Sequence, residues 1–431
     1  MELKKYKLGE IADFNKRSIS KSNSIKEIIY LDTSSITENV ISDTIHIDVK
    51  DAPSRAQRRV ENNTIVYSTV RPRLKHYGIL RNPQCNLIVS TGFVTIDLKE
   101  EYKGIIDPRF LYLQLTQSII TEYIGNIADT AVSAYPSINP SDISSISFNF
   151  PDFSIQKNIA DLWENFDQKI ALNRQINDNL EAMAKQLYDY WFVQFDFPNE
   201  EGKPYKSNGG KMVWNEKLKR EIPEGWKDVA LGNIIKELES GKRPKGGIDK
   251  SLREGIPSLG AEAISKLGDF DFSKTPYIPY GTKINSGIIR NNDILVYKDG
   301  AYVGKTTLYR DNFPYDFATI NEHVFLLRAL DPKIQEYIFF TLQKDYFFDT
   351  MQNLGKAKAA QPGLNQEDLK GIEILLPTKE VIYSYKERIE SIMADIFNNS
   401  KQIAILSKQR DELLPLLMNG QVSVNYHLSH D

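Results

Sequence analysis

The stretch NNTIVYST (Asn62–Thr69) places a polar turn before a short apolar run, and NNDILVYK (Asn291–Lys298) repeats this arrangement 229 or 230 residues later. A β-branched and aromatic run behind an asparagine-rich turn predicts a buried strand. Other segments recur in the same order: YKLGEIADF with WKDVALGNII, DPRFLYLQL with DPKIQEYIFFTLQ, and SAYPSINPSDISSISFNFP with AAQPGLNQEDLKGIEILLP. A repeat this long predicts a duplicated module, because solenoid repeats span only tens of residues.

The composition is that of an ordinary globular protein. The chain has 431 residues, of which 41% are hydrophobic and 26% charged, so two to four compact units are expected. The single cysteine, Cys85, excludes an intramolecular disulfide and a cysteine-cluster zinc site. MELKKYKLGE lacks the apolar run of a signal peptide, and no apolar stretch approaches the length of a membrane span. We therefore expect a cytoplasmic protein.

The positive charge is concentrated in two places. The net charge of −3 counts mildly against a dedicated nucleic-acid binder. However, the segment from Arg55 to Arg81 holds seven Lys or Arg residues and one acidic residue. The segment from Lys242 to Arg253 holds five Lys or Arg residues and one acidic residue. Each half of the chain thus has one local basic segment.

Each copy ends in a long helical pattern. Apolar residues recur on a seven-residue grid from behind Pro151 to about Trp191, and the grid reappears in the second copy. The predicted seam is Ile159, Leu162, Phe166, Asn173, Ile176, Leu180, Ile389, Ile392, Ile396, Ile403, Leu406 and Leu413. This pattern favours a coiled coil, with Asn177 on the polar flank, and the alternative is a pair of core helices in a bundle. Pro415 should kink or loosen the second helix, and Gly420 should end it.

The predicted organisation has six parts. They are a first globular domain (1–150), a first long helix (151–194), a central linker (195–225), a second globular domain (226–376), a second long helix (377–420) and a tail (421–431). Gly- and Pro-rich punctuation marks the linker. Trp214 and Trp226 are expected to be packed down, which would make the linker an ordered strap.

Catalytic motifs are missing. DGAYVGKTTLY resembles a phosphate loop, but Asp299 stands where the pattern requires glycine, so a hairpin turn presenting Lys298 and Lys305 explains it better. IDVK (Ile47–Lys50) lacks a second acid to share a metal ion, and the histidines show no ligand spacing outside the tail. We expect no catalytic residue, no metal site and no cofactor bound by this chain.

Basic turns stand at matching places in both copies and are candidate DNA contacts, because Lys and Arg bind phosphates and Arg also reads guanine edges. In the first copy the candidates are Arg55, Arg58, Ser68, Thr69, Arg71, Arg73, Lys75, Ser133 and Tyr135. In the second copy they are Lys242, Arg243, Lys245, Lys298, Asp299, Tyr302, Lys305, Lys356, Lys358 and Gln361. The alternative for any single residue is a solvated surface charge.

Several stretches resemble one family. WFVQFDFPNEEGKPYKSNGGKMVWNEKLKREIPEGW, IALNRQINDNLEAMAKQLY, YSTVRP, YKDG, SAYPSIN and QPGLN are similar to segments of the specificity subunits of type I restriction–modification systems. The resemblance covers essentially the whole chain. It implies an α+β fold class, with two similar α/β target-recognition domains separated by two long antiparallel coiled-coil helices in a pseudo-twofold repeat.

The resemblance also implies a division of labour. Each recognition domain reads one half of a bipartite double-stranded DNA target. The first copy has STVRPRLK where the second has KDGAYVGK, and this difference between the reading turns implies an asymmetric target. Two modification subunits methylate adenine with S-adenosylmethionine, and restriction subunits use ATP and Mg²⁺ to cleave unmodified DNA. The specificity subunit itself is non-catalytic. The open alternatives are a coiled-coil adaptor that does not bind DNA and an unrecognised DNA-modifying enzyme.

Overall fold

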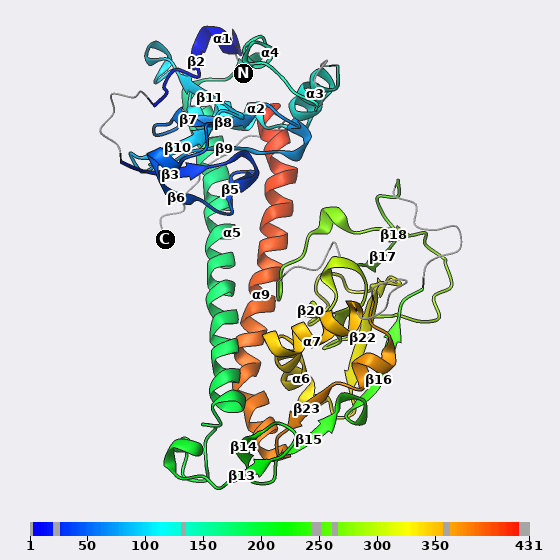
Figure 1. Cartoon of the computed structure of the whole chain (residues 1–431). Coiled ribbons are helices and arrows are strands. Elements are labelled where there is room, and N and C mark those ends of the chain that lie inside the picture. Colours follow the sequence, from blue (N-terminus) through cyan, green and yellow to red (C-terminus); the bar gives the residue numbers. More distant parts are fainter. Residues whose placement is uncertain are drawn as a thin grey trace, which may run out of the picture. The chain divides into compact units, whose positions relative to one another are not determined.

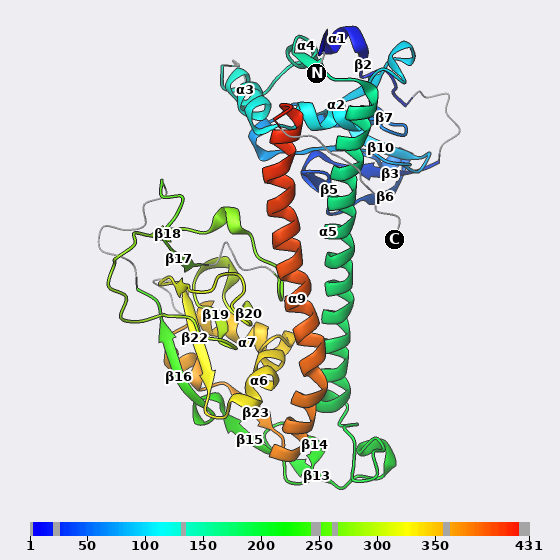
Figure 2. The same ribbon diagram turned by 180° about the vertical axis from the view of Figure 1, so that it is seen from behind.

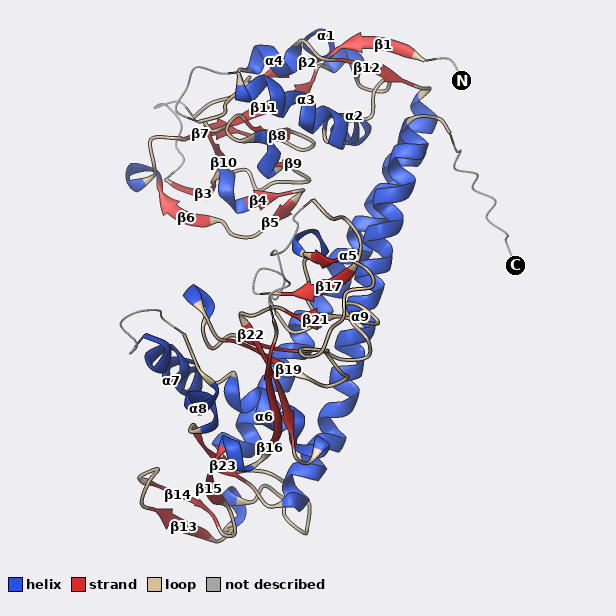
Figure 3. Cartoon of the chain, turned by 90° about the vertical axis from the view of Figure 1, so that its right-hand side faces the viewer, coloured by secondary structure: helices blue, strands red, loops and turns tan. Residues whose placement is uncertain are grey.

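The computed structural model describes residues 3–19, 26–130, 135–242, 251–260, 266–356 and 363–421, with the backbone alone at residue 301. The chain divides into two compact units, the first formed by residues 1–168 with 408–431 and the second by residues 169–407. Two long helices, α5 (Phe153–Tyr188) and α9 (Lys379–Met418), contribute residues to both units. Helices and strands are mixed in each unit, so the fold is of mixed α/β type (Figures 1 and 3).

The first unit contains two larger sheets. The antiparallel sheet has the order β2-β11-β8-β9 (Ala12–Phe14, Phe93–Leu98, Ile65–Ser68, Tyr77–Ile79). The other sheet has the order β6-β3-β10-β7 (Ile45–Asp48, Glu27–Leu31, Leu87–Ser90, Ala56–Arg59), and its β3 and β10 are parallel. The remaining elements are β1 (Lys4–Lys7), α1 (Leu8–Ile11), β4 (Ile36–Thr37), β5 (Val40–Ile41), α2 (Pro108–Leu115), α3 (Ser118–Asp129), α4 (Pro140–Ser144) and β12 (Ser147–Phe150).

The second unit repeats this plan. Its antiparallel sheet has the order β16-β22-β19-β20 (Ile235–Ser240, Val324–Ala329, Ile294–Tyr297, Thr306–Leu308). Its second sheet has the order β18-β17-β21 (Tyr277–Ile278, Ile256–Leu259, Thr319–Ile320), with β17 and β21 parallel. The remaining elements are β13 (Met212–Asn215), β14 (Arg220–Pro223), β15 (Lys227–Ala230), α6 (Gln335–Leu342), α7 (Asp345–Lys356), α8 (Gln366–Lys370) and β23 (Glu373–Leu376).

The two quoted stretches form β8 and β19, as predicted, and each is the third strand of a sheet with the same order. All four residues of each strand are buried, which explains their continuous apolar character. The recurring segments around Asn139 and Asn365 contain helix-capping motifs. Asn139 and Asp142 form a capping box on α4, and Asn365 and Asp368 form the same box on α8. The repeated sequence therefore encodes repeated local structure.

In the second unit, the buried helix α6 lies between the β16-β22-β19-β20 sheet and α9 (Figures 1 and 2). All eight of its residues are buried. Tyr188 packs within 6.0 Å of the Tyr337 ring, and its hydroxyl lies 2.8 Å from the Thr341 Oγ1. The end of α5 is thereby fixed to the core of this unit.

The segment between α5 and β15 is ordered, as expected of a strap. Trp226 is buried and stacks on Phe197 at 5.3 Å between ring centroids. The prediction that Trp214 is packed down is wrong, because its side chain is 55% exposed. Trp214 lies on β13, which within the described ranges pairs with β14 alone, and a two-stranded hairpin leaves one face uncovered.

The helix ends follow the sequence signals in part. A short π-helical turn, Asp189–Val193, follows α5. The helix α9 continues through Pro415 to Met418, and Gly420 then takes a positive φ of 68°. Within the described ranges, no helix combines the length and the apolar character needed to cross a membrane.

Candidate nucleic-acid interface

In the first unit, three turns meet beside the end of β8. We call them the first turn cluster, formed by Thr69–Lys75, Thr91–Gly92 and Tyr135–Ser137. The backbone N–H of Thr69 donates to the Gly92 carbonyl at 2.9 Å, and the Thr69 carbonyl accepts from Ile138 N at 2.9 Å. Val70 and Ser137 pair as an isolated β-bridge. Segments far apart in sequence are thus held together by backbone hydrogen bonds.

The second unit builds the same arrangement beside β19. The second turn cluster is formed by Lys298–Lys305, Glu322–His323 and Gly363–Leu364. The N–H of Lys298 donates to the His323 carbonyl at 3.1 Å, and the Lys298 carbonyl accepts from Leu364 N at 2.7 Å. Asp299 and Gly363 form the isolated bridge that matches Val70 and Ser137. The two clusters therefore share the same pattern of backbone hydrogen bonds but carry different side chains.

Arg71 is an exposed candidate of the first turn cluster. It has a positive φ of 49°, and its guanidinium carbon lies 4.9 Å from the centroid of the exposed Tyr135 ring. Its backbone N–H donates to the Pro136 carbonyl at 2.9 Å, so two turns fix its position. An exposed Arg beside an aromatic ring can contact a phosphate or a base edge.

Several other candidates of the first copy have protein partners. Arg73 binds Glu122 at 3.0 Å and Asp129 at 2.7 Å, and these hydrogen bonds raise the pKa of its guanidinium. Lys75 pairs with Glu38 at 2.5 Å. The structure argues against Ser68 as a direct contact, because it is 1% exposed and its hydroxyl donates to the Val70 carbonyl.

The remaining candidates of the first copy border the cluster. The Thr69 hydroxyl donates to the Gly92 carbonyl at 2.9 Å. Arg55 is exposed, and its carbonyl accepts from Thr91 N, which places it next to the same turn. Arg58 lies on β7 opposite Val89, and its Nε is buried without a hydrogen-bond partner in the part of the chain that the structure describes. Ser133 lies outside the described residues.

The candidates of the second copy converge on the 3-10 turn Gly300–Tyr302, which lies between β19 and β20. The stretch that resembles a phosphate loop is therefore a β-hairpin connection. Lys305 lies with its Nζ 4.5 Å from the centroid of the Tyr302 ring, and both residues are exposed. Lys298 is 22% exposed and lies with its Nζ 5.4 Å from the Phe325 ring.

Two lysines of the second copy lie at the edge of this cluster. Lys356 is exposed at the end of α7, directly after Gly355, whose carbonyl accepts from Gly363 N. Lys242 is exposed and follows Gly241, where an added Cβ would lie 2.4 Å from the Asn321 carbonyl oxygen. Arg243, Lys245, Lys358 and Gln361 lie outside the described residues.

The sequence did not single out His323 as a candidate, although the structure places it in the second turn cluster. Its Nδ1 lies 2.9 Å from Asp299 Oδ2, and its side chain is 51% exposed. The residue comes from the turn before β22, which the fold brings beside the turn after β19. The only available signal was its position just before a repeated strand.

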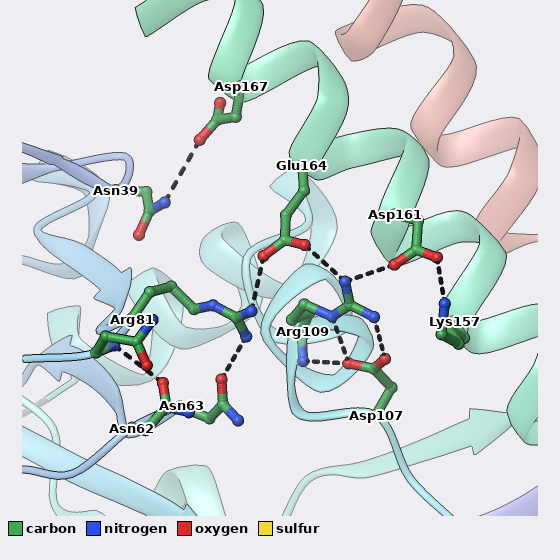
Figure 4. Close-up of polar contacts among 11 residues, drawn as sticks. Asn39, Asn62, Asn63, Arg81, Asp107, Arg109, Lys157, Asp161, Glu164 and Asp167 are labelled. Atoms are coloured by element: carbon green, nitrogen blue, oxygen red, sulfur yellow. Dashed lines mark hydrogen bonds and ion pairs between the residues drawn. The ribbon is translucent and has the colours of Figure 1, made fainter.

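Charged networks attach the globular part of each unit to a long helix within that unit. Figure 4 shows Arg81 and Arg109 reaching Glu164 on α5, with Arg109 also binding Asp107 and Asp161. The hydrogen bond to Asp107 is the main cause that raises the pKa of Arg109. In the second unit, Arg310 binds Glu336 at 3.3 Å and also binds Glu390 on α9.

Segments of α5 and α9 pair in antiparallel sense within each unit. In the second unit, Asn177 Nδ2 donates to the Ile396 carbonyl and to Ser400 Oγ, each at 3.1 Å. Asn173 Nδ2 donates to Gln402 Oε1 at 3.4 Å. In the first unit, Arg410 donates to Asp167 at 3.0 Å.

The buried positions differ in part from the predicted seam. Ile159, Ile389 and Ile396 are buried, and Leu162, Phe166, Asn173, Leu180, Ile392, Ile403 and Leu406 are partly buried. Ile176 and Leu413 are 37% and 38% exposed. The buried face instead uses positions one residue further on, namely Trp163, Ile170, Ala184, Met393 and Ser400, and the half-buried Asn177 joins them through its hydrogen bond to Ser400. Asn177, assigned to the polar flank, therefore lies in the contact.

The structure offers no ion site among the residues that it describes, since no cluster of three or more His, Cys, Asp or Glu suits a metal ion there. The Tyr67 ring below the first turn cluster is closed to solvent, and burial raises its pKa to about 12. The side chains that both clusters expose are those of Arg, Lys, Tyr, His and Asp. These side chains can bind a ligand through charge and hydrogen bonds.

Residues 1–182 and 223–414 match the family model described as Type I restriction modification DNA specificity domain. The HindI specificity subunit of Haemophilus influenzae is 27% identical over 97% of this chain and 99% of its own length. The MjaIX specificity subunit of Methanocaldococcus jannaschii is 24% identical over 98% of this chain and 94% of its own length. The crystal structure of the type I restriction–modification S subunit from M. genitalium superposes with a TM-score of 0.56 at 16% identity, over 97% and 96% of the two chains.

Proposed function

The chain belongs to the type I restriction–modification DNA specificity family, and we propose that it selects the DNA target of a type I restriction–modification complex. The observation that carries this proposal is the pair of turn clusters. Each presents exposed basic and aromatic side chains on a backbone scaffold with matching hydrogen bonds. Basic side chains contact phosphates, and side chains on fixed turns read base edges.

We propose that the target is double-stranded, bipartite and asymmetric. The first cluster would read one half-site and the second cluster the other. The support is the contrast between the two scaffolds, since Arg71 lies beside Tyr135 in the first, whereas Asp299 meets His323 in the second. Different donors and acceptors on equivalent turns select different bases.

The long helices would set the spacer between the half-sites. α5 has 36 residues and α9 has 40, which correspond to about 54 Å and 60 Å at the usual rise per residue. Polar contacts such as Asn177 with Asn399 at 3.0 Å support a fixed pairing, because buried polar groups in a helix contact specify register.

The modification subunits would dock on the helical region. Along the end of α5 and the turn that follows it, five large apolar side chains are 37–56% exposed, namely Leu172, Ile176, Met183, Tyr190 and Val193. Ile176 belongs to the predicted seam, and Met183 and Tyr190 follow it at seven-residue intervals, but all three side chains are exposed. An apolar stripe of this kind suits a helix of a partner.

The chemistry would belong to the partners. We propose that two modification subunits bind S-adenosylmethionine and methylate adenine, and that restriction subunits use ATP and Mg²⁺. This chain would hold no cofactor of its own. Isothermal titration of the isolated chain with S-adenosylmethionine and with Mg²⁺ should give no binding signal, and saturable binding of either would favour an enzyme.

The main test is to co-express the chain with its modification subunit and to map methyladenine across the host DNA. One two-part asymmetric motif with a fixed spacer is the expected result. An assembled complex that methylates no motif, or a motif with one part only, would contradict the proposal.

A further inference from the structure

We propose that His323, oriented by Asp299, reads one base pair of the half-site recognised by the second turn cluster. The inference rests on the proposed function and deepens it, because it names the reading side chain and the chemistry of its contact. His323 would touch the base, and Asp299 would act as a positioning residue.

The fold fixes His323 before any DNA binds. Asn321 Oδ1 accepts from the His323 backbone N–H at 2.9 Å, and the His323 carbonyl accepts from Lys298 N at 3.1 Å. The ring Nδ1 lies 2.9 Å from Asp299 Oδ2. Backbone and ring are therefore both held, while the side chain remains 51% exposed.

Asp299 is fixed just as closely. Its backbone forms the isolated bridge with Gly363, and a Cβ at position 363 would lie 2.5 Å from Asp299 Oδ1. The carboxylate therefore lies directly against the Gly363 backbone, in space that a side chain at that position would occupy. A carboxylate held in this way sets the orientation of the histidine ring, as carboxylates do for metal-binding and catalytic histidines.

The contact leaves one ring atom for a ligand. In the tautomer that donates from Nδ1 to Asp299, Nε2 is the ring acceptor that a ligand can reach. The Glu322 carboxylate lies 3.6 Å from Nε2, so the surface around this atom is also rich in acceptors. In the major groove, adenine N6 and cytosine N4 offer the amino hydrogens that such a surface selects.

The first turn cluster shows whether the fold needs the Asp299–His323 pair. Val70 and Gly92 occupy the places of Asp299 and His323, yet the same backbone hydrogen bonds and the same isolated bridge form there. The scaffold therefore does not need the Asp299–His323 pair. A pair that the fold does not require, and that is partly exposed on a DNA-facing turn, is available for recognition.

The experiment is methyladenine mapping with the complete specificity–modification complex, using the wild type, His323→Ala, Asp299→Ala and the double variant. We expect His323→Ala to lower discrimination at one base-pair position of one half-site by roughly three- to tenfold, the range of a single hydrogen bond. Asp299→Ala should relax the same position, and the double variant should be no worse than His323→Ala. Lys219→Ala, an exposed change on the β13–β14 connection, is the control and should leave the motif unchanged.

The outcomes separate the two levels of inference. A wild-type complex without a two-part motif would contradict the proposed function. A wild-type two-part motif that His323→Ala leaves intact, or relaxes in both half-sites, would overturn the reading role alone. Relaxation by His323→Ala and Asp299→Ala at two different positions would overturn the positioning role of Asp299.

Discussion

The guanidinium of Arg81 lies 3.2 Å from the carboxylate of Glu164 on α5, and the second copy repeats this relationship between Arg310 and Glu390 on α9 (Figure 4 shows the first pair). Both arginines follow the last strand of the antiparallel sheet. The environments differ, because the Arg81 side chain is 42% exposed and that of Arg310 is 5% exposed. Equivalent ion pairs in the two copies should therefore differ in their importance for stability.

Replacing Arg310 with Ala should destabilise the second unit by about 3–5 kcal/mol, because the buried Glu336 carboxylate then keeps Lys386 as its one cation among the residues that the structure describes. Arg81→Ala should cost less than about 1 kcal/mol, as expected of a partly exposed pair. Urea denaturation of the whole chain, followed by hydrogen exchange to assign each unit, measures both effects.

A compensating variant is the control for Arg310. Arg310→Met combined with Glu336→Gln should recover most of the loss, because it removes the uncompensated charge and leaves Lys386 paired with Glu390 at 2.5 Å. Equal, small effects of Arg81→Ala and Arg310→Ala would show that burial does not govern these pairs.

Asn177→Ala should weaken the helix contact, since Asn177 exchanges hydrogen bonds with Ile396, Ser400 and Asn399. The expected loss is about 1–3 kcal/mol in the free energy of unfolding of the second unit. Asn179→Ala, an exposed change on the same helix, is the matched control and should be nearly neutral. If the helices set the spacer, the Asn177 variant should also methylate motifs with more than one spacer length. A single spacer together with unchanged stability would remove Asn177 from this role.

The repeated strands, turns and helix caps could be predicted because they depend on local patterns. The runs IVYS and ILVY and the motifs around Asn139 and Asn365 specify structure through nearby residues. The seam was harder to predict, because α5 has apolar residues on a broad arc. Sequence periodicity does not distinguish the face that packs within the chain from an exposed stripe such as Leu172 and Met183.

The candidate site could be located from sequence but not resolved into roles. The basic turns were visible as charge in the sequence, whereas the partners of Arg73 on α3 and the pairing of Asp299 with His323 arise from tertiary contacts. Trp214 shows the same limit, since an apolar residue is buried only when another element covers it.

Arg71→Ala should reduce discrimination in one half-site by roughly 1–3 kcal/mol if the side chain reads a base. Arg73→Ala is the informative comparison, because Glu122 and Asp129 already bind that side chain. It should leave both half-sites unchanged and cost less than about 1 kcal/mol of stability. Binding of the assembled complex to oligonucleotides altered in one half-site measures the difference. A stronger effect of Arg73 than of Arg71 on DNA preference would reverse the assignment.

Acid should weaken the second unit through Glu237. The hydrogen bond from Arg328 holds the pKa of Glu237 below its usual value near 4.5. A carboxyl with a lowered pKa in the folded state stabilises the fold above the unfolded-state pKa, and this contribution is lost as pH falls through the folded-state value. The urea concentration at the unfolding midpoint should therefore decrease as the pH is lowered below about 4.5. This decrease should be less steep in Glu237→Gln. Identical slopes for both proteins between pH 3 and pH 5 would exclude Glu237 as a source of the effect.

A charge on the exposed stripe of α5 should impair assembly with the modification subunit. Met183 is 53% exposed, so Met183→Glu should leave the stability of the isolated chain within about 0.5 kcal/mol of wild type. At an apolar interface the same carboxylate would be desolvated without a partner, which typically costs several kcal/mol and should lower co-purification at least tenfold. Ala182→Glu places the same charge on an exposed position about 100° away from Met183 around α5 and should assemble normally. If both variants assemble like the wild type, the modification subunit does not use this face, and the stripe formed by Leu172, Ile176 and Met183 must serve another contact.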